Sequence, residues 1–354
     1  MYQHGGDIYT HPHCVDFSSN VNPFGIPASV KEAAGKALEE CHHYPDVHCR
    51  KLKEAIRKKD GIQKAGIFCG NGAADVIFAL VLAARPRKAL VLAPGFQEYE
   101  QALRSLDCGI VHHTLSEDRG FVPGEELLSD IDSSLDLVFL CNPNNPTGAL
   151  LPGELLQRIV TGCREKHVLL VVDECFNDFL ETPAEHSLMS LTETEPHLFV
   201  LKAFTKMYAI PGLRLGYGVT CNEQLLQKME QVTQPWRVSV PAQAAGVAAA
   251  GEAVFAEESR MALLKEKTYL LQVLKELSLL VFGSEANYLF FRGPAELGKK
   301  LLKRGFLIRN CSNYRGLGAG YYRIAVRKHE DNEALAAALR KELPAGADAG
   351  SGPR

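Results

Sequence analysis

The sequence predicts an α/β protein with two domains: a large domain whose mostly parallel seven-stranded sheet lies between helices, and a smaller α+β domain. Short β-rich runs alternate with helical stretches through the middle of the chain, which is typical of a parallel sheet. The runs 89–93, 136–141 and 168–173 are apolar on both faces, as expected when helices cover both sides of a sheet. A long charged helical pattern at 253–276 ends the alternation and indicates a second domain.

The predicted strands and helices of the large domain follow one another along the chain. Its predicted strands occupy 65–69, 88–93, 109–115, 135–141, 168–173, 197–201 and 215–219. Helices at 73–84 and 153–166 fill two of the gaps, because both stretches are bounded by Gly or Pro. Two later strands, 287–292 and 321–326, lie among helices and belong to the small domain.

These elements predict four segments. An N-terminal segment, 1–45, packs with the small domain; the large domain spans 46–251 and the small domain 252–341. The tail at 342–354 is mainly Ala, Gly, Ser and Pro, a composition that cannot bury a core, so we expect it to be disordered.

Composition excludes several classes of function. Among 354 residues, 39 Lys and Arg against 42 Asp and Glu leave a formal charge of −3, which does not favour nucleic acid as a partner. The longest apolar run, 76–84, is far shorter than the roughly 18 residues of a membrane span. The first 20 residues hold no apolar block typical of a secretory signal, so we expect a cytoplasmic protein without membrane contact.

The 10 cysteines form no C-x-x-C pair, so we expect reduced thiols and no metal site.

Two loops follow predicted strands. The run C-G-N-G-A-A-D at 69–75 joins a strand to a helix, where small residues let backbone N–H groups approach an anion. When this run is considered alone, an ordinary tight turn between strand and helix is the favoured interpretation. The run N-P-N-N-P-T-G at 142–148 lies beyond the carboxyl end of a strand, where ligands bind in open α/β sheets. Its residues also favour turns for conformational reasons alone.

Two charged groups carry the candidate chemistry. Asp173, followed by Glu174, ends a very apolar strand, so a buried carboxylate there needs a cationic partner. A helix cap or a metal ligand are alternatives for this acidic pair. Lys206 follows Thr205 and precedes Arg214 among apolar residues. A lysine in such a setting lowers its pKa readily and can form a Schiff base, although most lysines are solvated surface residues.

In this order and spacing, the four segments resemble the pyridoxal 5'-phosphate site of the fold type I aminotransferase family, over the chain to about residue 340. The resemblance implies that Lys206 binds the cofactor covalently and that Asp173 pairs with its ring nitrogen. It also implies that Asn145 bonds the ring 3'-oxygen and that Phe96 stacks on the ring. The implied phosphate ligands are Gly72, Ala73, Ala74, Thr205 and Arg214. Tyr44 matches a tyrosine that reaches the neighbouring subunit's site, which implies a homodimer.

The ends of the chain narrow the resemblance. The runs at 4–8, 16–25, 308–314 and 321–327 are similar to the threonine-phosphate decarboxylase branch of the family, which serves cobalamin biosynthesis. Arg323 matches the arginine that binds the substrate carboxylate, and Arg309, His4 and Asn20 match positions that hold other polar groups. Two arginines suit a doubly anionic phosphoamino acid, because guanidinium binds carboxylate and phosphate bidentately. Arg327 is interpreted as a surface charge.

The resemblance implies a lyase that converts O-phospho-L-threonine into (R)-1-aminopropan-2-ol O-phosphate and CO₂. Two residues depart from the wider family pattern: Phe176 replaces a tyrosine that donates to the ring 3'-oxygen, and Ala203 replaces a hydroxyl residue near the phosphate. O-phospho-L-serine decarboxylation stays open as an alternative, since one methyl group is worth only about 1–3 kcal/mol of discrimination. Histidinol-phosphate aminotransferase activity also stays open, as does a cofactor-binding regulator without catalysis.

Overall fold

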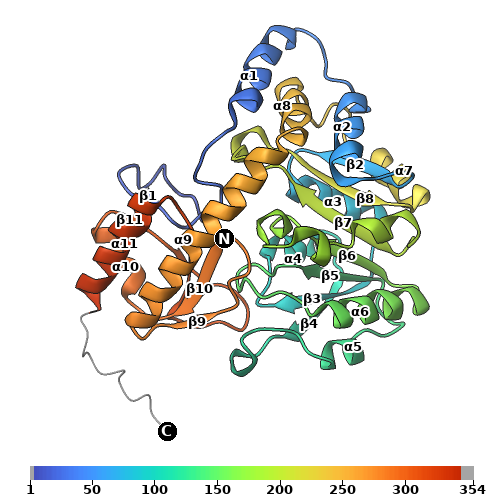
Figure 1. The fold of residues 1–354 in the computed structure, drawn as a ribbon. Helices are drawn as coiled ribbons and strands as arrows, with labels where there is room; N and C mark the ends of the chain where they lie inside the picture. Colours follow the sequence, from blue (N-terminus) through green and yellow to red (C-terminus); the bar gives the residue numbers. More distant parts are fainter. Residues whose placement is uncertain (1–3, 344–354) are drawn as a thin grey trace.

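The computed structural model describes residues 4–343, and its main feature is the predicted seven-stranded sheet (Figure 1). The strand order is β2-β8-β7-β6-β5-β3-β4, and all strands are parallel except β8. The strands are β2 (Gly66–Gly70), β3 (Lys88–Ala93), β4 (Gly109–Thr114), β5 (Leu137–Cys141), β6 (Leu169–Asp173), β7 (Leu198–Ala203) and β8 (Gly216–Thr220). The prediction of a mostly parallel sheet is therefore confirmed.

Helices cover both faces of this sheet. In β5, Leu137, Phe139 and Cys141 belong to a core shared with helices on one face, and Val138 and Leu140 belong to the core on the other. The first core includes α3 (Ala73–Ala84), α4 (Gln97–Arg104) and α7 (Glu223–Val232), and the second includes α5 (Glu126–Asp130) and α6 (Gly153–Glu165). This double burial explains why the strand sequences are apolar at consecutive positions.

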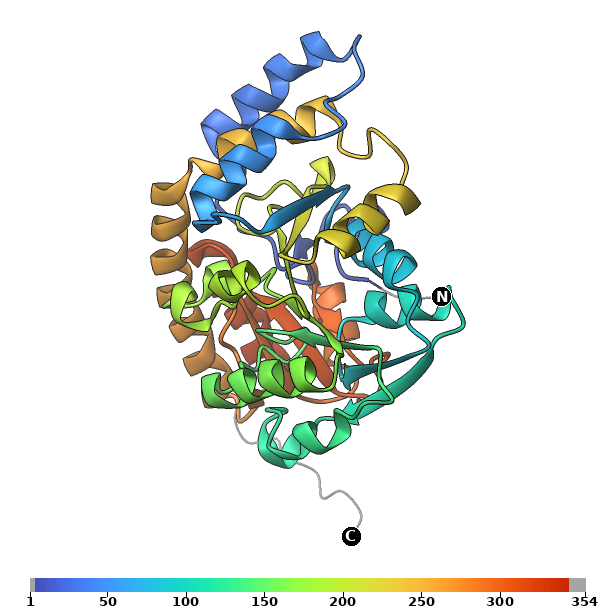
Figure 2. The ribbon, with the colours of Figure 1, turned by 90° about the vertical axis from the view of Figure 1, so that its right-hand side faces the viewer.

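The small domain has its own antiparallel sheet of order β12-β13-β10-β9. Its strands are β9 (Leu280–Phe282), β10 (Tyr288–Arg292), β12 (Arg309–Asn310) and β13 (Tyr321–Ala325). Its helices are α9 (Ala253–Glu276), α10 (Leu297–Lys303) and α11 (His329–Glu342). Helix α9 runs from the large domain into the small one, as two perpendicular views show (Figures 1 and 2). We keep the predicted boundary near residue 252 as a proposal.

The N-terminal segment divides between the two domains. Strand β1 (Val15–Asp16) pairs in parallel with β11 (Phe306–Leu307) of the small domain. Helix α1 (Ala28–Lys36), however, packs against α8 (Val240–Ala250), as does α2 (Arg50–Asp60). The expectation that all of 1–45 packs with the small domain is wrong for α1, because this helix packs on the alanine-rich α8 and its Val30 is fully buried.

The last helix extends further toward the C-terminus than expected. Glu342, which was assigned to the tail, belongs to α11 and forms an ion pair with Arg304. The rest of the predicted disordered tail, from residue 344 on, lies outside the described residues. All ten cysteines lie within 4–343 and carry free thiols, as expected. Within this range the structure contains no helix with the length and apolar character of a membrane span.

Candidate active site

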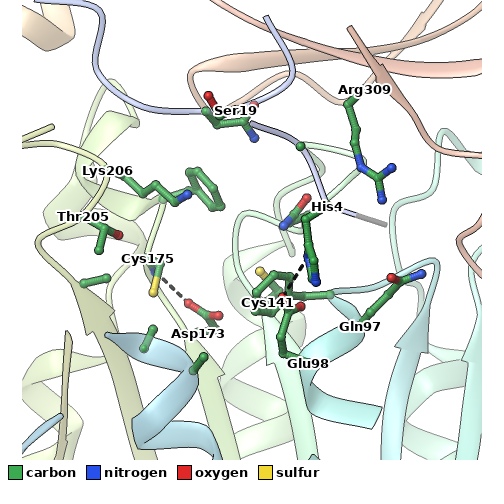
Figure 3. A pocket seen from close by; sticks show the side chains of 18 of the residues that line it. His4, Ser19, Gln97, Glu98, Cys141, Asp173, Cys175, Thr205, Lys206 and Arg309 are labelled. Atoms are coloured by element: carbon green, nitrogen blue, oxygen red, sulfur yellow. Dashed lines mark hydrogen bonds and ion pairs between the residues drawn. The ribbon is translucent and has the colours of Figure 1, made fainter. Parts of the chain in front are cut away.

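A cavity of about 250 Å³ lies between the two domains, at the carboxyl edge of the large sheet (Figure 3). The loops that follow β2, β3, β5, β6 and β7 all contribute to it, as do the N-terminal segment and the small domain. The predicted site residues that line it are His4, Asn20, Ala73, Ala74, Phe96, Asn145, Asp173, Thr205, Lys206, Arg214, Arg309 and Arg323. Segments far apart in the sequence are thus brought to one place.

Two predicted site residues do not line the cavity. Gly72 caps α3 beside it, with a φ of 88°, and a Cβ there would lie 2.3 Å from Nη2 of Arg214. Gly72 therefore packs directly on the Arg214 guanidinium. Tyr44 lies on the surface, 77% exposed, and stacks on Trp236 with ring centroids 4.4 Å apart. Its expected role concerns a neighbouring subunit, so this single chain leaves that role a prediction.

Asp173 lies at the end of β6 and is buried. Tyr99 Oη donates to its Oδ2 over 2.6 Å, and the backbone N–H of Cys175 donates to its Oδ1 over 2.9 Å. Burial raises the pKa of Asp173, although these two hydrogen bonds oppose the shift. A carboxylate in this position gains most from a cationic partner.

Lys206 extends into the same cavity from the loop after β7 (Figure 3). Its Nζ lies 5.7 Å from the ring centroid of Phe176. Burial lowers the pKa of Lys206, and the charge of Arg323 lowers it further. A depressed pKa increases the neutral fraction of the amine, the form that attacks a carbonyl group.

Arg309 and Arg323 face each other across two strands of the small domain. They are register partners on β12 and β13, so both side chains lie on the same face of the sheet. Both are about 95% buried. Their guanidinium groups lie over the rings of Tyr314 and Tyr288, at 5.2 and 5.4 Å. Two buried like charges at opposed positions are unfavourable unless an anion compensates them.

Several polar atoms in the cavity lack a partner. Within residues 4–343, neither side-chain atom of Asn20 nor Nε of Arg323 has a hydrogen-bond partner, and all three are buried. The other nitrogens of Arg323 donate to Oδ1 of Asn145 and, over 2.8 Å, to the carbonyl oxygen of Ser18. Buried polar atoms are normally satisfied, so these unpaired atoms indicate a polar ligand.

A second region of the cavity suits a phosphate group. Ala73 and Ala74 form the first turn of α3, whose N-terminus carries a partial positive charge. Thr205 and the exposed guanidinium of Arg214 lie on the same side. Together with the Asp173 carboxylate and the Lys206 amine, this arrangement fits pyridoxal phosphate. The anion site suits its phosphate group, the amine suits its aldehyde, and the carboxylate suits its protonated ring nitrogen.

The two departures from the family pattern lie in the same cavity. Phe176 packs edge-on against Tyr288, with centroids 5.1 Å apart, and Ala203 lines the wall without a hydroxyl group.

Arg327, interpreted as a surface charge, is half-buried instead. It bonds Asp331 and the carbonyl oxygen of Asp16, both over 2.9 Å, and so ties the N-terminal segment to the small domain.

Several residues of this site had no role predicted from the sequence. Gln97 and Glu98 line the cavity directly after Phe96, Tyr99 holds Asp173, and Tyr314 lies beneath Arg309. His4 Nδ1 lies 3.3 Å from Oε1 of Glu98, and this contact connects the N-terminal segment to α4 (Figure 3). The position of Gln97 and Glu98 just beyond the predicted strand 88–93 was the available signal.

Comparisons with known proteins give a consistent result. The family described as "Aminotransferase class I and II" matches residues 12–339. A threonine-phosphate decarboxylase of Salmonella typhimurium is 38% identical over 96% of each chain. The solved histidinol-phosphate aminotransferase of Clostridium acetobutylicum superposes with a TM-score of 0.87 at 29% identity, covering 92% of this chain and 98% of that one. The solved L-threonine-O-3-phosphate decarboxylase of Porphyromonas gingivalis gives 0.79 at 26% identity, covering 92% and 98%.

Proposed function

This chain belongs to the aminotransferase class I and II family, and from that premise we propose that it decarboxylates O-phospho-L-threonine. The products are (R)-1-aminopropan-2-ol O-phosphate and CO₂, a step of cobalamin biosynthesis. The activity named for its Salmonella relative supports this choice over transamination. The family depends on pyridoxal phosphate, and the cavity residues fit that cofactor.

The observation that carries the proposal is the opposed pair Arg309 and Arg323. Two buried guanidinium groups on one sheet face, open to the cavity that holds Lys206, match a substrate with two anionic groups. We assign Arg323 and the unpaired amide of Asn20 to the carboxylate. Arg309 and His4 then hold the phosphate of the substrate.

The proposed cofactor contacts follow the same geometry. Lys206 would hold the aldehyde carbon, Asp173 would pair with the ring nitrogen, Phe96 would stack on the ring and Asn145 would bond the 3'-oxygen. The backbone of Gly72, Ala73 and Ala74 would hold the cofactor phosphate together with Thr205 and Arg214. When bound, pyridoxal phosphate accepts the electron pair that is released as the bond to the carboxylate breaks.

The protein decides which bond at Cα breaks. Arg323 and Asn20 orient the carboxylate, and the phosphate contacts of Arg309 and His4 fix the other end of the substrate, so that CO₂ departs while the Cα hydrogen stays. Lys206 Nζ then donates the proton that Cα needs after CO₂ has left. Burial and the charge of Arg323 lower the pKa of Lys206, which eases the release of a proton from its ammonium form.

The test is an assay of the purified, cofactor-loaded protein with O-phospho-L-threonine. We expect CO₂ and one equivalent of 1-aminopropan-2-ol phosphate, without a requirement for a keto acid. Transfer of the amino group to 2-oxoglutarate, with glutamate formed and no CO₂ released, would reject decarboxylation. Parallel assays with O-phospho-L-serine determine whether the methyl group contributes to specificity.

Histidinol-phosphate aminotransferase is the second candidate, because a solved enzyme of that name has the same fold over 92% of this chain. Its substrate carries a single phosphate and no carboxylate, so it leaves one arginine of the opposed pair without an anion. Turnover of histidinol phosphate with 2-oxoglutarate, faster than CO₂ release from phosphothreonine, would favour this candidate.

We also propose that the enzyme is a cytoplasmic homodimer. The exposed stack of Tyr44 on Trp236 supports an interface there, since two large aromatic side chains are otherwise left in water. In the dimer, Tyr44 of each subunit contacts the cofactor phosphate of the other. Equilibrium sedimentation of the loaded protein measures the dimer directly.

A further inference from the structure

Gln97 and Asn313 form a reciprocal bridge across the junction of the two domains. Gln97 is the first residue of α4 in the large domain, and Asn313 lies in the loop between β12 and β13 of the small domain. Gln97 Nε2 donates to the carbonyl oxygen of Asn313 over 3.0 Å, and Asn313 Nδ2 donates to Oε1 of Gln97 over 3.4 Å. The Gln97 amide thus joins the domains beside the cavity, through both the backbone and the side chain of Asn313.

The same asparagine holds Arg309. Its Oδ1 accepts from Nη2 of Arg309 over 3.0 Å, while Nη1 of Arg309 donates to the carbonyl oxygen of Asn310 over 2.8 Å. The ring of Tyr314 lies 5.2 Å from the guanidinium carbon. Contacts at both terminal nitrogens and at the face fix the plane of the guanidinium group.

We propose that Gln97 and Asn313 are positioning residues that aim Arg309 at the phosphate of the substrate, an inference that rests on the proposed function. Gln97 directly follows Phe96, the residue assigned to the cofactor ring. The bridge therefore sets the position of the phosphate-binding arginine relative to the cofactor side of the cavity. Such a link matters because small displacements of a binding group reduce both affinity and rate.

The choice of an amide at position 313 supports this role. A carboxylate in its place would hold Arg309 as well, but it would neutralise the guanidinium charge and compete with the substrate phosphate. An amide oxygen orients the guanidinium and leaves its charge available to an anion. The near-isosteric variant Asn313→Asp is therefore expected to be worse than Asn313→Ala, the reverse of what a purely structural contact predicts.

The experiment compares two amines that differ only in the phosphate group. Cofactor-loaded wild type, Gln97→Ala, Asn313→Ala and Asn313→Asp are titrated with 1-aminopropan-2-ol and with its O-phosphate, and the ratio of the two dissociation constants is measured by absorbance. We expect the phosphate preference to fall about 5-fold in Gln97→Ala, about 10-fold in Asn313→Ala and on the order of 100-fold in Asn313→Asp. Binding of the unphosphorylated amine stays unchanged. Gln272→Ala, on the exposed face of α9, is the matched control.

The outcomes separate this inference from the proposed function. Equal weakening of both amines, or a milder effect of Asn313→Asp than of Asn313→Ala, overturns the positioning role. If wild type releases no CO₂ from phosphothreonine but the phosphate preference falls as expected, the proposed reaction fails and the positioning role stands. If CO₂ is released and the preference is unchanged in all variants, the reaction stands and the positioning role fails.

Discussion

Lys206 is the residue on which the proposed chemistry depends most directly. We expect Lys206→Ala to reduce CO₂ release by about 10²–10⁴-fold, because the variant loses both the amine that binds the cofactor and the proton donor to Cα. Borohydride reduction followed by mass spectrometry should find the cofactor attached to wild type and not to the variant. Lys228→Ala, an exposed lysine on α7, serves as the control. Covalent attachment that persists in Lys206→Ala would refute the assignment.

Glu98 makes the folded protein sensitive to pH. Burial raises the pKa of Glu98 to about 7 from an ordinary value of 4.5, although Lys206 and Arg309 oppose the shift. A carboxyl group with a raised pKa stabilises the fold while it is protonated, and this stabilisation is lost as the pH rises through about 7. We expect the free energy of unfolding of the wild-type apoprotein, relative to Glu98→Gln, to fall on the order of 2 kcal/mol between pH 5 and pH 8.

Urea unfolding at the two pH values measures this difference. The control is Glu258→Gln, an exposed carboxyl group on α9, whose stability should follow that of wild type. If the stabilities of wild type and Glu98→Gln change in parallel with pH, Glu98 does not titrate in this range and the explanation by burial is wrong.

Sequence patterns indicated the residues with distinctive chemistry and missed those that act through distant partners. Asp173 and Lys206 could be predicted because each charge adjoins an apolar strand. Tyr99, which donates to Asp173 from 74 positions away, carries no such signal. Gln97 meets Asn313 across 216 positions, a contact that depends on how the domains pack. Local spacing contains no information about such contacts.

At the scale of elements, burial on both faces made the central strands predictable. Strand β3 and helices α3 and α9 were predicted with the observed boundaries. Strands β1, β11 and β12 have two residues each, too few for any periodic pattern. The antiparallel direction of β8 also has no signature, because its side chains are buried like those of its parallel neighbours.

The turn between β2 and α3 gives a prediction at this scale. We expect Gly72→Ala to weaken pyridoxal phosphate binding about 10-fold, because the residue has a φ of 88° and the new Cβ would displace the Arg214 guanidinium. Binding of pyridoxal, which lacks the phosphate, should change little. The comparison is made by absorbance titration. Gly35→Ala in α1, where a Cβ meets no atom within 4 Å, is the control, and equal cofactor affinity in both variants contradicts the proposed phosphate site.

At the scale of the whole molecule, the cavity requires three parts of the chain. The large domain supplies Lys206 and Asp173, the small domain supplies Arg309 and Arg323, and the N-terminal segment supplies His4. Arg327 joins two of these parts through the carbonyl oxygen of Asp16. The site therefore forms only when the complete chain is folded, and separate halves are not expected to bind the substrate.

The proposed dimer adds a fourth part, Tyr44 of the neighbouring subunit, and subunit mixing tests it. Hydrogen bonds to charged groups contribute about 1.5–3 kcal/mol, so Tyr44→Phe alone should lower CO₂ release about 10-fold at limiting cofactor. Lys206→Ala alone is inactive. In a mixed dimer of the two variants, the site that keeps Lys206 receives an intact Tyr44 from the other subunit. Equal co-expression should therefore restore about a quarter of the wild-type turnover.

If Tyr44 instead served its own subunit, every site in the mixture would carry one of the two defects. Turnover would then stay near about one-twentieth of wild type, the value set by the remaining Tyr44→Phe sites. The roughly fivefold gap between the two outcomes exceeds the error of a CO₂ assay. A mixture of Lys206→Ala with Lys228→Ala gives the upper reference, because Lys228 lies on the exposed side of α7. That reference is about half of wild-type turnover, since half of its sites keep Lys206. Restoration to about half of the reference assigns the exposed Tyr44 to the neighbouring site, and turnover near one-tenth of the reference confines each active site to a single chain.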